Sequence, residues 1–145
     1  MVRRVVWIFA ITGVVIAGGL TAMLLSGQSS VRVPAIAALV TFAAVIISYL
    51  GGIEAGIALR EEAGTQRTRT LALGLSAVPA LAAWGVLWLP STQYQLAAAI
   101  ALFVAVWTSD MWLARQGLLP SWFVDMRTAV TAAVCVILGA ALYLL

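Results

Sequence analysis

Charged side chains are scarce in this sequence, and two kinds are missing altogether. Lysine and histidine do not occur, all eight basic residues are arginine, and Cys135 is the single cysteine among 145 residues. Without histidine and with one thiol, the chain offers no metal cluster and no intrachain disulfide, and Cys135 is interpreted as a small apolar core residue. The HExxH, GxSxG, GxGxxG, P-loop and CxxC patterns are also absent, so we expect no enzyme, no metal and no cofactor.

The composition requires a lipid environment. Hydrophobic residues make up 64% of the chain and charged residues 9%, whereas soluble domains carry about 25% charged residues. The net charge of +3 would be compatible with nucleic-acid binding in a soluble protein. Here the arginines flank apolar runs, which is the pattern of membrane-topology signals. We therefore expect the lipid bilayer, and not nucleic acid, as a partner.

Five apolar runs are long enough to cross a membrane as helices, which takes about 17–25 residues. They cover residues 5–25, 34–59, 70–89, 94–114 and 124–145. The first run is too long for the apolar part of a signal peptide and lacks a clean cleavage site, so we expect a retained helix. Short connections make successive helices antiparallel neighbours. The sequence predicts an all-α polytopic membrane protein with five transmembrane helices in an antiparallel bundle, as a single transmembrane domain over residues 1–145.

Two prolines have expected places in these helices. Pro34 suits the first turn of the second helix, where a missing N–H costs little. Pro79 lies near the middle of the third and predicts a kink.

The arginines are distributed unevenly between the two ends of the predicted bundle. With five spans, seven arginines share one face, and Arg32 is alone at the other. The seven are Arg3, Arg4, Arg60, Arg67, Arg69, Arg115 and Arg127. By the positive-inside rule, we expect the N-terminus in the cytoplasm and the C-terminus in the periplasm. Lysine-free composition suggests a GC-rich bacterial genome, hence a bacterial inner membrane.

The stretch GGIEAGIALR, residues 51–60, makes the second helix the predicted centre of the bundle. Glu54 lies on one side of this helix, together with Gly51. Ser48, Gly52 and Gly56 form a small-residue seam on the opposite side, where another helix could approach closely. Because neither a carboxylate nor a glycine groove suits lipid, we expect neighbouring helices on both sides.

A second acid, Asp110, lies near the end of the fourth helix, at a depth similar to that of Glu54. Arg115 and Arg127 lie at the same end of the bundle. An ionised carboxylate in hydrocarbon requires a partner or a proton. One interpretation is a single polar cluster of Glu54, Asp110, Arg115 and Arg127; the other is that each charge reaches the headgroups alone.

The segment GLLPSW, residues 117–122, predicts an elbow at the membrane interface. Gly117 ends the fourth helix, Pro120 prevents its continuation, and Trp122 lies at headgroup depth. The elbow is interpreted as a structural hinge or as a docking site for a partner.

Three segments in order resemble the DUF3429 / transmembrane protein 69 family of small integral membrane proteins. They are residues 46–59 (IISYLGGIEAGIAL), 76–90 (SAVPALAAWGVLWLP) and 117–128 (GLLPSWFVDMRT). The family occurs in bacteria and in mitochondria. The resemblance therefore implies an inner membrane, and it also implies a five-helix plan. The positions that match its motifs are Gly51, Gly52, Pro79, Trp84, Pro90, Asp110, Pro120, Trp122 and Arg127. The family often has a basic or imidazole residue followed by tryptophan where this chain has Glu54–Ala55, so the resemblance implies no family-wide catalytic role for Glu54.

Two functions of different classes follow from these features. The first is a non-enzymatic accessory or assembly subunit of a larger inner-membrane complex, with a link to respiratory or other energy-transducing machinery implied by analogy with the family's distribution. Its partners would be other membrane-protein subunits or further copies of the chain. The alternative is a small proton-coupled transporter or channel that uses Glu54 and Asp110. A third class, a membrane enzyme or a quinone- or lipid-binding protein, is disfavoured by the lack of histidine, metal ligands and an evident nucleophile.

Overall fold

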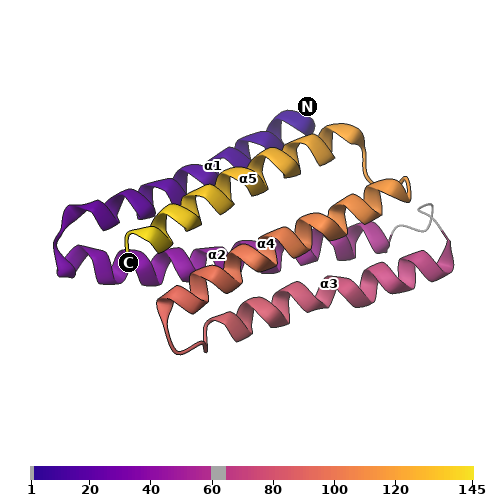
Figure 1. Ribbon diagram of the computed structural model, residues 1–145. Coiled ribbons are helices and arrows are strands. Elements are labelled where there is room, and N and C mark those ends of the chain that lie inside the picture. The colour runs from indigo at the N-terminus through magenta and orange to yellow at the C-terminus, as the bar shows by residue number, and fades with distance from the viewer. Residues whose placement is uncertain (1, 60–64) are drawn as a thin grey trace.

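The computed structural model describes residues 2–59 and 65–145, and over these residues every regular element is a helix. Five long helices run side by side and are joined by short connections (Figure 1). They are α1 (Val2–Met23), α2 (Ser29–Ala58), α3 (Gln66–Val86), α4 (Thr92–Arg115) and α5 (Ser121–Tyr143), with a short 3-10 turn, η1 (Leu24–Ser26), after α1. Each long helix has the length and apolar character needed to cross a membrane. The predicted all-α bundle of five spanning helices is confirmed.

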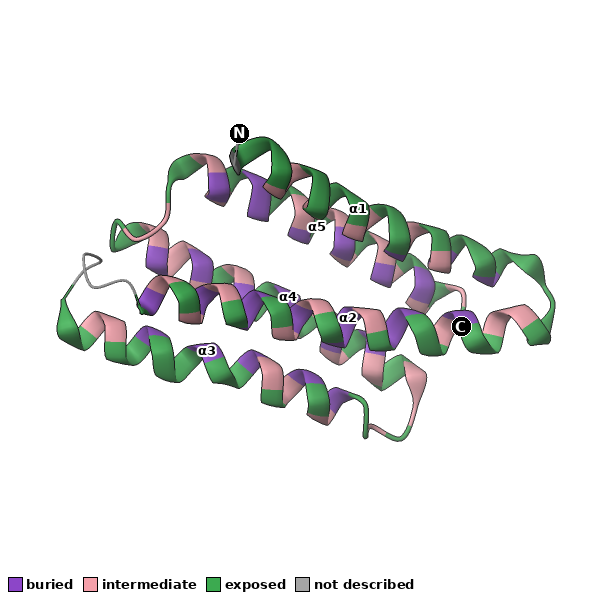
Figure 2. Ribbon diagram, turned by 180° about the vertical axis from the view of Figure 1, so that it is seen from behind, coloured by how far each residue is buried: buried purple, intermediate pink, exposed green. Residues whose placement is uncertain are grey.

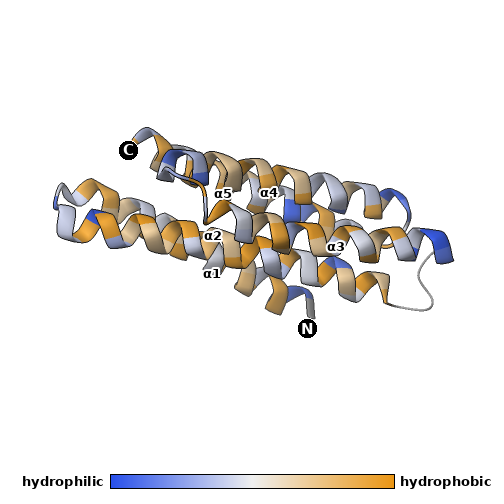
Figure 3. Cartoon of the chain, turned by 90° about the horizontal axis from the view of Figure 1, so that it is seen from below, coloured by the Kyte–Doolittle hydropathy of each residue, from blue (hydrophilic) through white to orange (hydrophobic). Residues whose placement is uncertain are grey.

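The N-terminus and the C-terminus lie at opposite ends of the bundle (Figure 1). The connection between α4 and α5 lies at the N-terminal end, and the turn between α1 and α2 lies at the other. Apolar residues cover most of the helix lengths, and hydrophilic residues gather mainly near the ends (Figure 3). Arg60 of the predicted arginine-rich face lies outside the described residues.

Every helix begins earlier in the chain than its apolar run. The largest difference is at α2, which begins at Ser29, so that Pro34 lies inside the helix and not in its first turn. Hydropathy marks the part of a helix that lies in hydrocarbon, whereas polar residues form the first turns of α2, α3 and α4 at the interface. Two of these starts are capped by side-chain oxygens: Thr65 accepts from the Thr68 N–H at 3.2 Å, and Ser91 accepts from the Tyr94 N–H at 3.3 Å.

The carbonyl groups at three helix ends are capped by side chains of other helices. Arg69 of α3 donates through Nε to the carbonyl of Ala58, the last residue of α2, at 3.1 Å. Arg32 of α2 donates through Nη2 to the carbonyl of Leu144, just after α5, at 2.8 Å. Gln95 of α4 donates to two carbonyls beyond the end of α3. These bonds satisfy acceptors that the helices themselves leave unpaired, and the arginines also favour the negative end of the helix dipole.

Helix α2 is the centre of the bundle, as its sequence predicts. It contacts α1, α3 and α4, and its contact with α3 is the most extensive. A Cβ atom added to Gly51 would lie 2.5 Å from the carbonyl oxygen of Ser76 and 3.4 Å from Cβ of Pro79. The backbones of α2 and α3 therefore meet at Gly51, on the side of α2 that also buries Glu54. Although Pro79 lies in mid-helix, α3 continues through it as one element.

The predicted seam of Ser48, Gly52 and Gly56 is not covered by another helix of the described chain, so close packing of a helix on it stays a prediction. Gly52 and Gly56 are exposed, and a Cβ atom at either would meet no atom of the described chain within 4 Å. The Ser48 hydroxyl donates to the carbonyl of Ala44, one turn earlier on its own helix. The sequence could not tell which side of α2 the other helices of the chain cover, and they cover the side of Gly51 and Glu54. The outer faces of the helices, including much of α1 and α3, remain exposed (Figure 2).

Candidate functional site: a buried polar cluster

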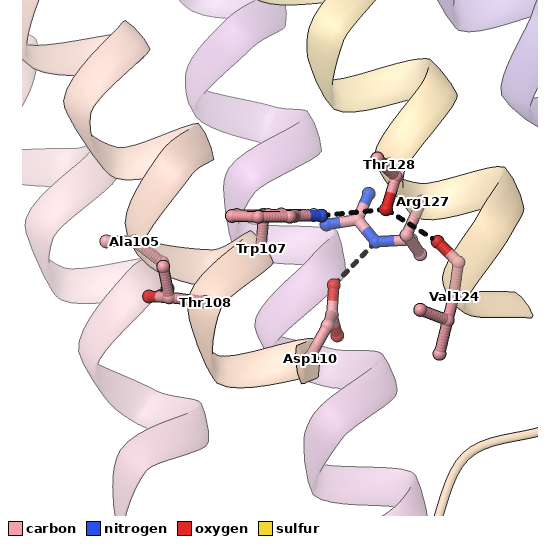
Figure 4. Close-up of polar contacts among 7 residues, drawn as sticks. All are labelled: Ala105, Trp107, Thr108, Asp110, Val124, Arg127 and Thr128. Atoms are coloured by element: carbon pink, nitrogen blue, oxygen red, sulfur yellow. Dashed lines mark hydrogen bonds and ion pairs between the residues drawn. The ribbon is translucent and has the colours of Figure 1, made fainter. Parts of the chain in front are cut away.

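An ion pair joins α4 to α5 inside the bundle. The Nε–H of Arg127 donates to Oδ2 of Asp110 over 2.7 Å, and the two side chains are only 5% and 4% exposed (Figure 4). Charged hydrogen bonds of this length are among the stronger ones in proteins. Because water is excluded from both groups, each charge depends on the other for its stabilisation.

The elbow between α4 and α5 sets the register that brings these two residues together. Gly117 adopts a left-handed conformation with φ of 75°. Its N–H donates to the carbonyl of Ala114 at 2.9 Å, and the N–H of Leu118 donates to the carbonyl of Leu113 at 3.1 Å. This bonding is the Schellman ending of a helix, in which glycine avoids the steric cost of the left-handed backbone. Pro120 is then the N-cap residue of α5.

The remaining elbow residue, Trp122, is half-buried in the first turn of α5. Its ring lies edge-on to that of Phe123, with ring centroids 5.8 Å apart. Phe123 is buried, so the pair anchors the start of α5 against the bundle. A partner-docking role for the elbow stays a prediction.

Glu54 lies beside the ion pair and is more deeply buried, with 1% of its surface exposed. Ser109 of α4 lies beside its carboxyl group, and the charges of Asp110 and Arg127 are close enough to act on it. Oε1 of Glu54 has no hydrogen-bond partner among the described residues. The residue also lines a cavity of about 320 Å³ between α2, α3 and α4, to which Trp112 and Pro79 contribute.

Three of the four residues of the predicted cluster therefore lie together: Glu54, Asp110 and Arg127. Arg115 does not join them, since it is the last residue of α4 and is exposed. Whether a residue this close to a helix end turns inward cannot be read from the sequence pattern.

Two hydroxyl groups near the cluster, those of Thr128 and Thr131, were not identified from the sequence. The indole N–H of Trp107 donates to Oγ1 of Thr128 at 3.0 Å, a second polar link between α4 and α5 (Figure 4). Thr131 is buried one helical turn after Arg127. Helical spacing is the signal that could have found Thr131, because residues four apart share a face.

The cluster holds two carboxyl groups and one guanidinium in a region that lipid surrounds. Such a set can hold or release a proton, most readily at Glu54, whose carboxyl group is not part of the ion pair. The described residues contain no group of three His, Cys, Asp or Glu side chains that could hold a metal ion.

Five spanning helices packed around a buried arginine–carboxylate pair define a multi-span helical membrane protein. Residues 2–143 of the chain match the family described as Protein of unknown function (DUF3429), and the chain belongs to this family. The resemblance seen in the three sequence segments is thereby confirmed. No curated protein and no solved structure matches the chain.

Proposed function

We propose that this protein is a non-enzymatic accessory or assembly subunit of a larger membrane complex. The observation that carries the proposal is the stripe of Ser48, Gly52 and Gly56 on α2. Small residues at this spacing let two helices approach closely in a membrane, where packing and not the hydrophobic effect drives association. The two glycines of the stripe are exposed, and no described part of the chain lies within 4 Å of a Cβ added to either. A helix of another subunit, or of a second copy, would fill this stripe.

The shape of the chain supports the same proposal. The five spans take up most of its length, and the connections between them are short. Contacts with other proteins would therefore be made within the bilayer, along the sides of the helices. We place the protein in a bacterial inner membrane with the N-terminus in the cytoplasm, a placement supported by the arginine distribution.

Extraction in a mild detergent, followed by affinity purification and native mass spectrometry, tests this function. We expect companion proteins or further copies in fixed stoichiometry. The double variant Gly52→Leu/Gly56→Leu should lose them, because two larger side chains would block close approach. Gly74→Leu on α3 is the matched control, since Gly74 is also exposed with open space around its Cβ position. A wild-type protein that purifies alone as a monomer would contradict the proposal.

Glu54 favours a second candidate, a small proton-coupled transporter or channel. A carboxyl group that is 1% exposed and has an unpaired oxygen within the described chain is costly to bury, and such a cost is typical of a group that has a function. Both buried acids lie close together, however, so the cluster connects neighbouring helices at one depth and does not form a path across the membrane. In liposomes loaded with a pH-sensitive dye, this candidate requires proton flux that Glu54→Gln abolishes and that Asp125→Asn, at an exposed acid of α5, preserves.

A further inference from the structure

A cavity of about 490 Å³ lies between α1, α2 and α5. Cavities of about 300–1,000 Å³ with apolar walls and a few polar groups are typical small-molecule sites. The walls here are almost entirely apolar, with Gly13, Phe42 and Leu138 among them. Arg127 and Thr131, both from α5, contribute the buried polar side chains.

Each of these two side chains has a buried polar atom without a hydrogen-bond partner in the described chain. The atoms are Nη2 of Arg127 and Oγ1 of Thr131, and the residues are 4% and 6% exposed. Nε of the same guanidinium is bonded to Asp110, so the Arg127 side chain is held in place. Because residues four apart share a helix face, both unpaired donors belong to the wall that α5 presents to the cavity. Leaving buried donors unpaired is costly in hydrocarbon.

The surroundings of the two atoms select the kind of molecule that would satisfy them. A plain hydrocarbon chain can fill an apolar cavity but accepts no hydrogen bond. An anionic head group is disfavoured, because Asp110 already balances the charge of Arg127 at 2.7 Å and Glu54 adds a second acid nearby. A neutral oxygen atom accepts hydrogen bonds, unlike a hydrocarbon chain, and adds no negative charge beside Asp110 and Glu54.

The cavity is reached from the side of the bundle. Phe9 of α1, together with Val45 and Tyr49 of α2, lines it, and all three are exposed. The opening thus lies between α1 and α2, on a surface that lipid would cover. α1 is also the least buried of the five spans: 17% of the residues in its most apolar 18-residue stretch are buried.

We propose that this cavity binds a lipid-soluble molecule whose buried end is a neutral carbonyl oxygen. Nη2 of Arg127 and the hydroxyl of Thr131 donate to that oxygen, and the apolar remainder extends between α1 and α2 toward the lipid. Two sources carry this chemistry: the ester carbonyl of a bilayer lipid and the ring carbonyl of a quinone. The site is separate from the stripe of Ser48, Gly52 and Gly56, so it can exist whether or not the protein is a subunit.

Four probes added to the full-length protein in dodecyl maltoside test the proposal. They are methyl oleate (an ester), decylubiquinone (a quinone), oleic acid (a carboxylic acid) and hexadecane (no acceptor). Native mass spectrometry reports binding, and thermal unfolding reports stabilisation. We expect one or both carbonyl probes to bind with one-to-one stoichiometry and to raise the unfolding temperature, and hexadecane to do neither. Binding of methyl oleate alone identifies a lipid ester as the source, and binding of decylubiquinone alone identifies a quinone.

Two variants connect binding to the cavity. Gly13→Leu fills it from α1, where an added Cβ meets no described atom within 4 Å, and should abolish binding. Gly19→Leu is its control, on an exposed site of the same helix outside the cavity lining. Thr131→Val removes one donor at nearly constant volume and should weaken binding by about three- to tenfold without lowering the unfolding temperature of the free protein.

The proposal is overturned if neither carbonyl probe binds, or if hexadecane or oleic acid binds as tightly as the carbonyl probes. It is also overturned if Thr131→Val and a folded Gly13→Leu protein both bind like wild type. Thr131→Val keeps the test decisive should Gly13→Leu fail to fold.

Discussion

The guanidinium of Arg127 has a different relation to each of its neighbours. Asp110 gives it a short charged hydrogen bond, while Glu54 lies close enough to act on it electrostatically without being hydrogen-bonded to it. A buried charge that loses its partner is strongly destabilising, whereas the loss of both partners leaves no uncompensated charge. The stability of this cluster is therefore a property of the Asp110–Arg127 pair and cannot be divided between its members.

The pair can be tested with a double-mutant cycle. Asp110→Asn and Arg127→Gln should each lower the free energy of unfolding in detergent by about 3–5 kcal/mol, because each leaves one buried charge alone. The double variant should be less destabilised than the sum of the single variants, with a coupling energy of about 1–3 kcal/mol. Thermal or denaturant unfolding of the purified proteins measures the free energy of unfolding of wild type, the two single variants and the double variant.

Arg115→Gln is the control for this cycle. Arg115 is exposed at the end of α4, so the change should alter stability by no more than about 0.5 kcal/mol. Strictly additive effects of the Asp110 and Arg127 changes would argue against the pair.

At the scale of the helix, two adjacent glycines of α2 have opposite surroundings. Gly51→Ala places a Cβ atom 2.5 Å from the carbonyl oxygen of Ser76 and must push α2 and α3 apart. Overpacking of this kind should destabilise the protein by about 1–3 kcal/mol. Gly52→Ala meets open space in the described structure and should be neutral or stabilising by up to about 1 kcal/mol, since alanine favours helix. Equal effects of the two changes on the unfolding temperature would contradict the close approach at Gly51.

The end of α4 gives a second prediction at this scale. Gly117 has φ of 75°, so Gly117→Ala should lower the free energy of unfolding by about 1 kcal/mol. Gly117→Asn should cost less, because asparagine tolerates the left-handed conformation better than alanine. Gly139→Ala in α5 is the comparison, as a helical glycine with open space around its Cβ position. If Gly117→Ala is as stable as wild type in thermal unfolding, the Schellman ending does not contribute to stability.

For the whole molecule, the odd number of spans fixes the two termini on opposite sides of the membrane. A reporter enzyme that is active only in the periplasm, fused after Leu145, should be active if the arginine-rich end faces the cytoplasm, as we propose. The same reporter fused before Met1 should be inactive. A stable but inactive C-terminal fusion with an active N-terminal fusion would reverse the proposed orientation.

Hydropathy and loop length were enough to predict the number of helices and their antiparallel order, because lipid imposes a minimum length on each span. Gly117 and Pro120 likewise marked the elbow, since each has a strong backbone preference. The rotation of each helix about its own axis was harder to predict. Ser48, Gly52 and Gly56 form a regular stripe of small residues, yet only the packed bundle shows that the covered side of α2 is the one with Gly51. Thr131 was missed because a lone threonine in an apolar run is inconspicuous, although its spacing of four residues from Arg127 places it on the same helix face.

The bond between Arg32 and the carbonyl of Leu144 joins residues 112 positions apart. The ribosome makes α2 before α5, so Arg32 reaches the membrane before its acceptor exists. Until α5 is inserted, the guanidinium depends on water or lipid headgroups for hydrogen bonds. The bond then joins the hairpin of α1 and α2 to the end of α5, and a chain truncated before α5 would lack it.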